Sequence, residues 1–255
     1  MRPLLSACIL AAVLGASYNA NSVELKKTEG KNLESTIFYQ FSPTSVCSVD
    51  GQMKECQTPS EEEDATFSFY YNEHFSLLDI AKDYYAVAKP AEVQKKIVIN
   101  KSERKAQVYI NDCLLKEYPI SLGLNPQGDK VKAWDYKTPE GEFYVARKII
   151  DSKFGDGPAL AISYPNLEDA QRGLESGLIN KVQYNGIKRA MDQCKVPPVT
   201  PLGFDVWLHG GGVGRDWTYG CIAFTNQDMD EIYQFAQAGC DADSTDPLTK
   251  IIINP

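Results

Sequence analysis

The chain has 255 residues, of which 43% are apolar and 24% are charged, a composition typical of a globular protein and not of a disordered one. Its formal net charge is −8 and no basic tract stands out, which argues against a nucleic-acid partner. Many of its tyrosines and phenylalanines stand in alternating runs, which favours β structure.

The first 17 residues have the pattern of a secretory signal peptide. Arg2 precedes an apolar run at 3–14, and small residues follow at 15–17. The run is shorter than the ~20 residues that span a bilayer, and no later stretch approaches that length. Residues 5–8 (LSAC) have the residue types of a lipoprotein cleavage box, but cleavage there would leave half of the apolar run on the mature chain. We therefore predict an exported protein without a membrane span.

Export would place the cysteines in an oxidising compartment, where disulfides are expected. Cys47 and Cys56 flank an Asp50-Gly51 turn signal, and a local disulfide between them would stabilise the fold by ~3 kcal/mol. If Cys221 stays reduced, one of the other three cysteines has no partner. Those three are Cys113, Cys194 and Cys240.

Residues 18–92 form an N-terminal extension of mixed character. Alternating aromatic residues predict a strand at 66–71, and helical spacing of apolar residues predicts a helix at 76–88 that ends before a proline. The acidic run at 61–64 is typical of a solvated linker. His74 has no second histidine or cysteine pair nearby, so we expect a surface or capping role and no metal site.

Residues 93–255 predict one domain that is mainly β with helices, an α+β class. Strand patterns at 97–99, 106–110 and 114–122 follow one another across short turns. Another strand follows a Pro-Glu-Gly turn, in which proline fixes φ and glycine is free to take positive φ. A further short strand is predicted at 159–165.

Residues 166–203 interrupt the strands with two helix-like segments and a proline-rich exit. An insertion of this length is often a lid or a wall of a site. A pair of helices packed against the edge of a sheet would have the same pattern, and both interpretations stay open.

After the insertion the chain returns to strand structure. One strand ends on His209, another continues at 222–224, and Thr225 begins a helix with the pattern of a capping box. The sequence TKIIINP predicts a final buried strand. The residues expected on the buried face of the helix are Met229, Ile232, Tyr233 and Ala236.

The stretch HGGGVGRDWTYGCIAF, residues 209–224, contains the parts of a cysteine nucleophile. A thiol with a pKa of about 8.5 is mostly protonated at neutral pH, so Cys221 would need a base such as His209. Acyl transfer also needs donors for the developing oxyanion, which N–H groups in a glycine turn supply. Alternatively, both residues are structural, His209 at a strand end and Cys221 in the core. Because the other histidine lies in the extension, histidine chemistry in this domain has to use His209.

The region from about Ile97 to Pro255 resembles the L,D-transpeptidase catalytic domain (YkuD-like), a family that remodels bacterial peptidoglycan. The resemblance rests on the segments SLGLNPQGDK, KTPEGEFYV, ISYPN, HGGG and DWTYGCIAFTNQDMDEIY, which occur in this order over about three-fifths of the chain. In that family a His-Gly after a strand is followed by Ser/Thr-x-Gly-Cys, matched here by residues 218–221. The form DWT-x-GCIA resembles one branch of the family.

The resemblance implies a β-sandwich-like catalytic fold and acyl transfer through a thioester, with no metal and no organic cofactor. Cys221 would be the nucleophile and His209 its base, with the Gly210 carbonyl orienting the imidazole. The implied oxyanion donors are the backbone N–H groups of Tyr219, Gly220 and Cys221. The implied substrate contacts are Arg215, Trp217, Thr218 and Tyr164, of which Trp217 and Tyr164 are equally suited to the core.

Two positions depart from the commoner family pattern. Tyr219 stands where a histidine usually precedes Gly-Cys, and Ala223 stands where an arginine usually follows. Any substrate contact of that arginine is therefore missing here. Arg215 is the candidate to receive a substrate carboxylate in its place, since arginine binds carboxylates through two parallel hydrogen bonds.

The implied substrate is the peptidoglycan stem peptide, at a periplasmic or cell-wall location, and the acyl acceptor stays open. An amine of a neighbouring stem would give a cross-link, and an amine of a wall-anchored protein would give attachment. Water would give hydrolysis, the reaction of an amidase with the same fold. A non-catalytic wall-binding protein is the alternative from another class, and it predicts a Cys221 that is buried, unreactive or disulfide-bonded.

Overall fold

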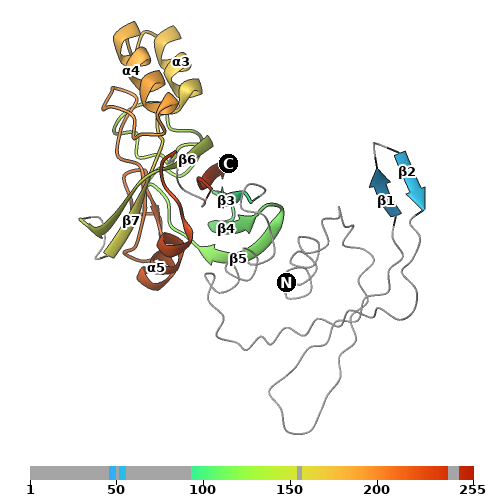
Figure 1. Cartoon of the computed structure of the whole chain (residues 1–255). Coiled ribbons are helices and arrows are strands. Elements are labelled where there is room, and N and C mark those ends of the chain that lie inside the picture. The colour runs from blue at the N-terminus through green and yellow to red at the C-terminus, as the bar shows by residue number, and fades with distance from the viewer. Residues whose placement is uncertain (1–45, 50–51, 56–92, 154–156, 241–246) are drawn as a thin grey trace. The chain divides into compact units, whose positions relative to one another are not determined.

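The computed structural model describes residues 46–49, 52–55, 93–153, 157–240 and 247–255 (Figure 1). The chain divides into two compact units, Met1–Ala88 and Lys89–Pro255, and each is described by itself. In the first unit, β1 (Val46–Val49) and β2 (Gln52–Glu55) pair antiparallel. The sequence predictions that lie outside the described residues are the signal peptide, the acidic linker, the strand at 66–71, the helix at 76–88, His74 and the partner Cys56.

The second unit is built on a curled eight-stranded sheet in the order β5-β4-β3-β10-β6-β7-β8-β9. Its strands are β3 (Lys95–Asn100), β4 (Lys105–Ile110), β5 (Cys113–Pro119), β6 (Gly141–Ser152), β7 (Gly157–Ile162), β8 (Trp207–His209), β9 (Ile222–Ala223) and β10 (Lys250–Asn254). The predicted class, mainly β with helices, is confirmed. The strand predicted at 114–122 ends earlier, at Pro119. Beyond it, Ser121 bridges to Ala223 and Gly123 to Thr218, so the two ends of the curled sheet meet.

Alternating burial explains why these segments form strands. In β3, Ile97 and Ile99 are buried while Val98 between them is partly exposed, and β10 repeats this pattern with its buried Ile251 and Ile253. The strand β8 differs, because all three of its residues are buried. A strand covered on both faces is held rigidly, and β8 is the strand that carries His209.

The predicted helix-like segments of the insertion are α3 (Leu167–Glu175) and α4 (Lys181–Asp192), which lie at one end of the unit (Figure 1). Each begins with an asparagine in a complete capping box, Asn166 with Asp169 and Asn180 with Gln183. The helices bury a small cluster of their own. Its buried members are Ala170, Ile179, Ile187 and Leu202.

The helix α5 (Asn226–Phe235) lies against β7 and β8 and begins, as predicted, after Thr225. The Thr225 hydroxyl accepts a hydrogen bond from the Asp228 amide. Met229, Ile232 and Ala236 are buried as expected, but Tyr233 is only half-buried. The helix places Phe235 in the core instead, because residues 232 and 235 are three apart and share one face.

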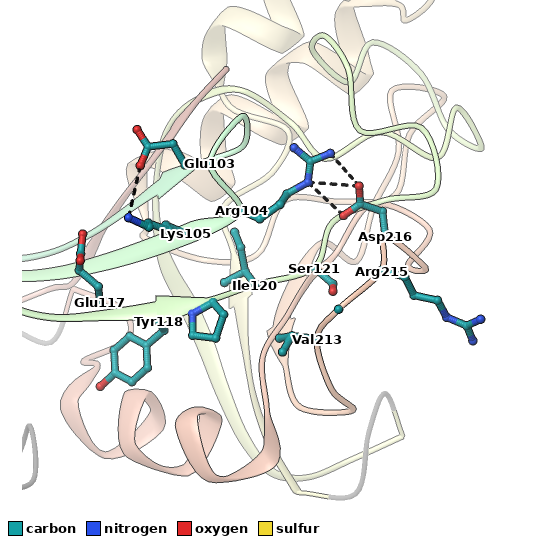
Figure 2. Close-up of a pocket in the computed structure, with 12 residues that line it drawn as sticks. Glu103, Arg104, Lys105, Glu117, Tyr118, Ile120, Ser121, Val213, Arg215 and Asp216 are labelled. Atoms are coloured by element: carbon teal, nitrogen blue, oxygen red, sulfur yellow. Dashed lines mark hydrogen bonds and ion pairs between the residues drawn. The ribbon is translucent and has the colours of Figure 1, made fainter.

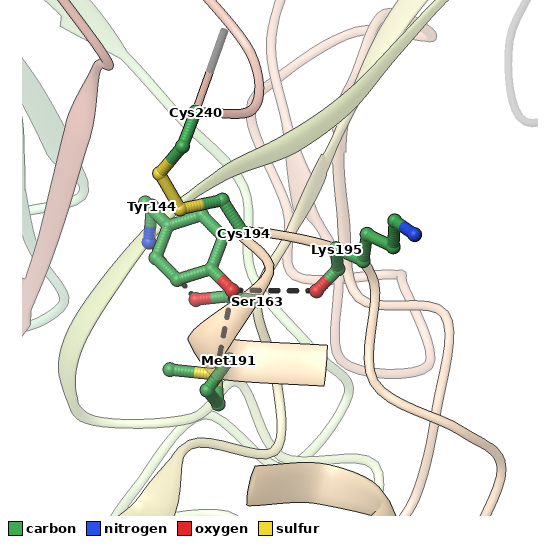
Figure 3. Close-up of a disulfide and its surroundings, with 6 residues drawn as sticks. All are labelled: Tyr144, Ser163, Met191, Cys194, Lys195 and Cys240. Carbon is green, nitrogen blue, oxygen red and sulfur yellow. Dashed lines mark hydrogen bonds between the residues drawn. A yellow bond between two sulfur atoms is a disulfide. The ribbon is translucent and has the colours of Figure 1, made fainter. Parts of the chain in front are cut away.

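The described residues contain a disulfide between Cys194 and Cys240, one of the pairings that the sequence left open (Figure 3). It joins the chain just after α4 to the chain that follows α5, with the two Cα atoms 5.4 Å apart. Next to it, the Tyr144 hydroxyl of β6 donates a hydrogen bond to the Lys195 carbonyl at 3.3 Å. The base of the insertion is therefore tied to the sheet. No helix in the described part of the chain has the length and apolarity to cross a membrane.

Candidate active site

The pairing of strands brings His209 and Cys221 to the same face of the sheet. His209 ends β8 and pairs with Ala159 on β7, while Cys221 immediately precedes β9. Cys221 packs with Ala159, Ala161 and Trp207 in one cluster. Because directly paired residues point to the same face of a sheet, the Ala159 contact places Cys221 on the face that carries the His209 side chain.

The His209 ring is held in one orientation by a hydrogen bond to the backbone of the next residue. Its Nδ1 lies 2.6 Å from the Gly210 carbonyl oxygen, the hydrogen bond that the resemblance implied. A carbonyl can only accept, so Nδ1 carries the hydrogen and Nε2 of the neutral ring keeps its lone pair. The ring edge packs against Trp217, with 5.6 Å between ring centroids. Burial lowers the His209 pKa, and the hydrogen bond to Gly210 opposes this shift only in part.

Gly210 has no room for a side chain. A Cβ atom at this position would collide with the Asn226 side chain at the start of α5. The Asn226 Oδ1 atom accepts a hydrogen bond from the Gly211 amide at 2.7 Å. The first residue of α5 therefore fixes the backbone turn whose carbonyl orients His209. The sequence pattern places Asn226 only in a helix start and gives no signal of this second role.

Cys221 is a reduced thiol, only 8% exposed. Its S–H group donates to the Asp205 carbonyl at 3.6 Å. The pKa of this thiol is raised to about 11, and burial is the largest cause. The charge of Asp205 also raises the pKa, whereas a hydrogen bond from the Trp207 backbone and the charge of Lys130 lower it. The resting site therefore combines an uncharged thiol with an uncharged imidazole.

The turn at 218–221 is organised by the buried Thr218 side chain. Its hydroxyl donates to the Cys221 carbonyl at 2.7 Å and accepts from the Gly220 amide at 3.1 Å. Among the described residues, the amides of Tyr219 and Cys221 have no acceptor. Of the three oxyanion donors implied by the resemblance, Gly220 is thus already occupied and the other two are available.

The loop at residues 130–138, which the sequence marks only as a turn region, packs against this turn. A Cβ atom on Gly220, which has a φ of 130°, would lie 2.6 Å from the Lys137 carbonyl oxygen. The buried Thr138 hydroxyl accepts from the Gly123 amide and donates to the Cys221 carbonyl. The same loop buries Lys130, whose ammonium forms an ion pair with Asp135 at 2.7 Å. A lysine and an aspartate five positions apart give no sequence signal of such a pair.

Arg215 lies exposed at a neighbouring cavity of about 680 Å³. Figure 2 shows its side chain pointing away from the other labelled residues of the cavity. Its neighbour Asp216 forms an ion pair with Arg104 and accepts from the Leu122 amide at 2.9 Å. Ser121, which also lines this cavity, pairs with Ala223 just beyond Cys221, so the cavity adjoins the strand that follows Cys221.

The other three predicted substrate contacts lie at different depths. Trp217 is half-buried against His209, and its indole N–H donates to the Gly212 carbonyl. Thr218 is buried with both functions of its hydroxyl engaged inside the turn. Tyr164 is 1% exposed and donates to the Leu202 carbonyl at 2.8 Å. This environment is typical of the core, which is the alternative that the sequence leaves open for Tyr164.

In the described residues, no three His, Cys, Asp or Glu side chains gather as a metal site would require.

Comparison with known proteins identifies related sequences. The family defined by the L,D-transpeptidase catalytic domain (YkuD) matches residues 94–253. The YafK protein of Escherichia coli, whose name places it among the L,D-transpeptidases, is 27% identical over 166 residues, 63% of this chain and 53% of YafK. The same values hold for strains K12 and O157:H7. The chain thus spans about half the length of the curated relatives it matches.

Solved structures with a similar arrangement include the helical cell shape determining protein Pgp2 from Campylobacter jejuni. The likeness has a TM-score of 0.44 at 23% identity and covers 64% of this chain and 48% of Pgp2. An L,D-transpeptidase from Mycobacterium tuberculosis H37Rv gives a TM-score of 0.37 at 13% identity, covering 64% of this chain and 58% of that one.

Proposed function

The chain belongs to the family of L,D-transpeptidase catalytic domains, and from this premise we propose that it is an exported enzyme that remodels peptidoglycan through a thioester on Cys221. The single observation that carries the proposal is the hydrogen bond of 2.6 Å between His209 Nδ1 and the Gly210 carbonyl. It leaves Nε2 as the basic nitrogen on the sheet face that Cys221 shares.

In the first step, Cys221 Sγ attacks the carbonyl carbon of the diamino-acid residue in a stem tetrapeptide. The thiol hydrogen turns from the Asp205 carbonyl to His209 Nε2, which takes the proton as the carbon–sulfur bond forms. Collapse of the tetrahedral intermediate breaks the amide bond, and the imidazolium returns the proton to the departing D-alanine amine. The proton transferred at attack leaves with the amine, so the thioester enzyme carries a neutral His209.

Two amides are suited to hold the oxyanion of the tetrahedral intermediate. The amides of Tyr219 and Cys221 have no acceptor among the described residues, whereas the Gly220 amide donates to Thr218. We therefore narrow the implied set of three donors to Tyr219 and Cys221. Loss of one such donor lowers kcat by on the order of 100-fold or more in comparable sites.

In the second step an acceptor attacks the thioester carbonyl, with His209 again taking a proton. An amine of a second stem peptide or of a wall-anchored protein regenerates an amide, and water gives a carboxylate. The proposed partners are thus peptidoglycan stem peptides, at a periplasmic or cell-wall location, and neither step calls for a cofactor.

The burial of Cys221 supports a second candidate, a non-catalytic wall-binding protein. A thiol that is 8% exposed, with a pKa raised to about 11, matches part of what that alternative predicts. The reduced state of Cys221 matches the enzyme, because a structural disulfide would have removed the nucleophile.

Incubation with tetrapeptide muropeptides, followed by mass spectrometry, separates these functions. The purified chain is compared with its Cys221→Ala variant. A new dimer that depends on Cys221 supports transfer, and a shortened monomer that depends on Cys221 supports hydrolysis. If neither sample changes the muropeptides, both enzymatic functions are wrong and wall binding remains.

A further inference from the structure

Four aromatic side chains form what we call the aromatic platform beside the candidate nucleophile: Trp134, Tyr136, Phe204 and Tyr219. Tyr136 and Tyr219 pack edge to face with 5.3 Å between centroids, and Trp134 and Phe204 do so at 6.1 Å. Trp134 is 64% exposed, Tyr136 40% and Tyr219 66%. Isolated apolar residues at a surface need no explanation, but grouped exposed aromatics mark an interaction surface.

Two residues of the platform, Phe204 and Tyr219, belong to segments that are connected to the thiol. Phe204 is bonded in sequence to Asp205, whose carbonyl accepts the Cys221 S–H group. Tyr219 lies two residues before Cys221, in the turn whose amides are the proposed oxyanion donors. The platform therefore includes a residue from the segment that carries Cys221 and a residue from the segment that accepts its hydrogen bond.

The loop residues of the platform are held in an unusual backbone conformation. Trp134 has a φ of 63° and Tyr136 a φ of 58°, values that bulky side chains rarely adopt. Such conformations persist only where surrounding contacts enforce them, and they concentrate at functional sites. Here the residue between them enforces it, because the Asp135 carboxylate accepts from Lys130 Nζ and from the amides of its own loop.

We propose that the aromatic platform binds the glycan of the substrate, a β-1,4-linked N-acetylhexosamine strand. The C–H-rich faces of sugar rings stack on aromatic rings, whose faces carry partial negative charge, and rigid tyrosine and tryptophan rings lose little conformational entropy on binding. Tyrosine hydroxyls add hydrogen bonds to sugar hydroxyls and acetamido groups.

This inference rests on the proposed function for the identity of the polymer. The attacked carbonyl belongs to the third residue of a stem peptide, and three residues span at most ~10 Å from the sugar to which they are joined. The platform begins two residues from the nucleophile, at Tyr219, so one ligand is able to reach both. Glycan binding would hold the stem peptide at the thiol.

The test is a calorimetric titration of the full chain, as the Cys221→Ala variant, with a peptide-free hexamer of β-1,4-linked N-acetylglucosamine. We expect saturable binding, accompanied by a change in tryptophan fluorescence, because Trp134 is more exposed than the buried Trp207 and the half-buried Trp217. Trp134→Leu keeps an apolar side chain without a flat ring and is expected to weaken binding about tenfold. Trp134→Phe keeps a ring and is expected to stay within about twofold.

Two further variants control this comparison. Val182→Ala changes a 79% exposed apolar residue on α4 and is expected to leave the affinity unchanged. Tyr219→Leu tests the platform at a residue with an ordinary φ, in case Trp134→Leu fails to fold. Absence of hexamer binding overturns the proposal. So does equal binding by the Leu and Phe variants, or a monomer–dimer equilibrium that depends on Trp134 while sugar binding does not.

The titration also separates this inference from the proposed function, since no turnover is needed. Transpeptidation without hexamer binding would overturn the glycan site alone. Hexamer binding that depends on Trp134, in a protein whose parent form leaves muropeptides unchanged, would overturn the enzymatic function alone.

Discussion

Burial raises the pKa of Cys221 and lowers that of His209, and both shifts favour the uncharged side chain. The two shifts therefore disfavour a thiolate–imidazolium ion pair between Cys221 and His209 before the substrate binds. In the proposed mechanism the proton moves only when the thiol attacks, and the neutral His209 acts as a general base. The acid limb of the pH–rate profile then reports the pKa of His209, because the imidazolium cannot accept a proton.

We expect kcat/KM to fall with decreasing pH only below the ordinary histidine pKa of 6.5. Burial is the largest cause of the lowered pKa, and Trp217 packs directly on the ring. Trp217→Ala should therefore admit water, stabilise the imidazolium and move the acid limb to higher pH. The measurement is the pH profile of thioester formation, with Trp217→Phe as the control that keeps the ring covered. A limb that stays in place or moves to lower pH would contradict the assignment of His209 as the base.

Lys130 gives a second prediction at the scale of single residues. Its buried ammonium lowers the Cys221 pKa, while Asp135, its partner, is not among the groups that affect this thiol. Removing only one member would leave a buried unpaired charge, so the informative variant replaces both, Lys130→Met with Asp135→Asn. We expect the Cys221 pKa to rise and alkylation by iodoacetamide at pH 9 to slow about threefold, since only the thiolate reacts.

The matched control for this pair is Lys132→Met, which removes an exposed lysine from the same loop. It should leave the alkylation rate unchanged, since Lys132 is not among the groups that shift the Cys221 pKa. Faster alkylation in the double variant would show that the buried pair does not stabilise the thiolate.

At the scale of elements, the turn that carries the candidate oxyanion donors depends on close packing against the loop that contains Lys137. Gly220→Ala would place a Cβ atom 2.6 Å from the Lys137 carbonyl oxygen at a φ of 130°. We expect a loss of about 2–4 kcal/mol in the free energy of unfolding, measured by urea denaturation. Gly212→Ala is the control, because Gly212 also has positive φ but no atom within 4 Å of the added Cβ, and it should cost about 1 kcal/mol. Equal losses in both variants would mean that backbone conformation alone, and not the contact, limits this turn.

Local patterns predicted the elements that depend on local interactions. The helices of the insertion and α5 follow apolar spacing and capping residues, and β4 follows its alternation of buried and partly exposed residues. The sequence could not predict where β5 ends, because residues 121–123 bond to Ala223 and Thr218, about a hundred positions later. Such pairing depends on the curl of the whole sheet.

The same limit applies to the candidate site. Its candidate pair, His209 and Cys221, was recognisable because histidine is rare in this chain and the segment is glycine-rich. Lys130, Thr138 and Asp205 support that pair from loops that carry no motif for such a role, and only the folded chain brings them to Cys221. Tyr164 shows the opposite problem. The resemblance implies a substrate contact for this aromatic residue, but its side chain is buried as a core residue would be.

At the scale of the whole molecule, the disulfide between Cys194 and Cys240 links segments that are 46 residues apart in sequence. In the chain-entropy account, closing a loop of this length stabilises the folded state by about 4 kcal/mol, chiefly by restricting the unfolded chain. We expect a variant with Cys194→Ser and Cys240→Ser to lose a comparable part of its free energy of unfolding in urea. Reductant should destabilise the parent chain more than the double variant, because only the parent chain has this disulfide to lose. Because the disulfide lies at the base of the insertion and not at the turn of Cys221, alkylation of Cys221 under native conditions should not change. A double variant as stable as the parent chain would show that the tie between α4 and the chain after α5 is already held by other contacts, such as that of Tyr144 with Lys195.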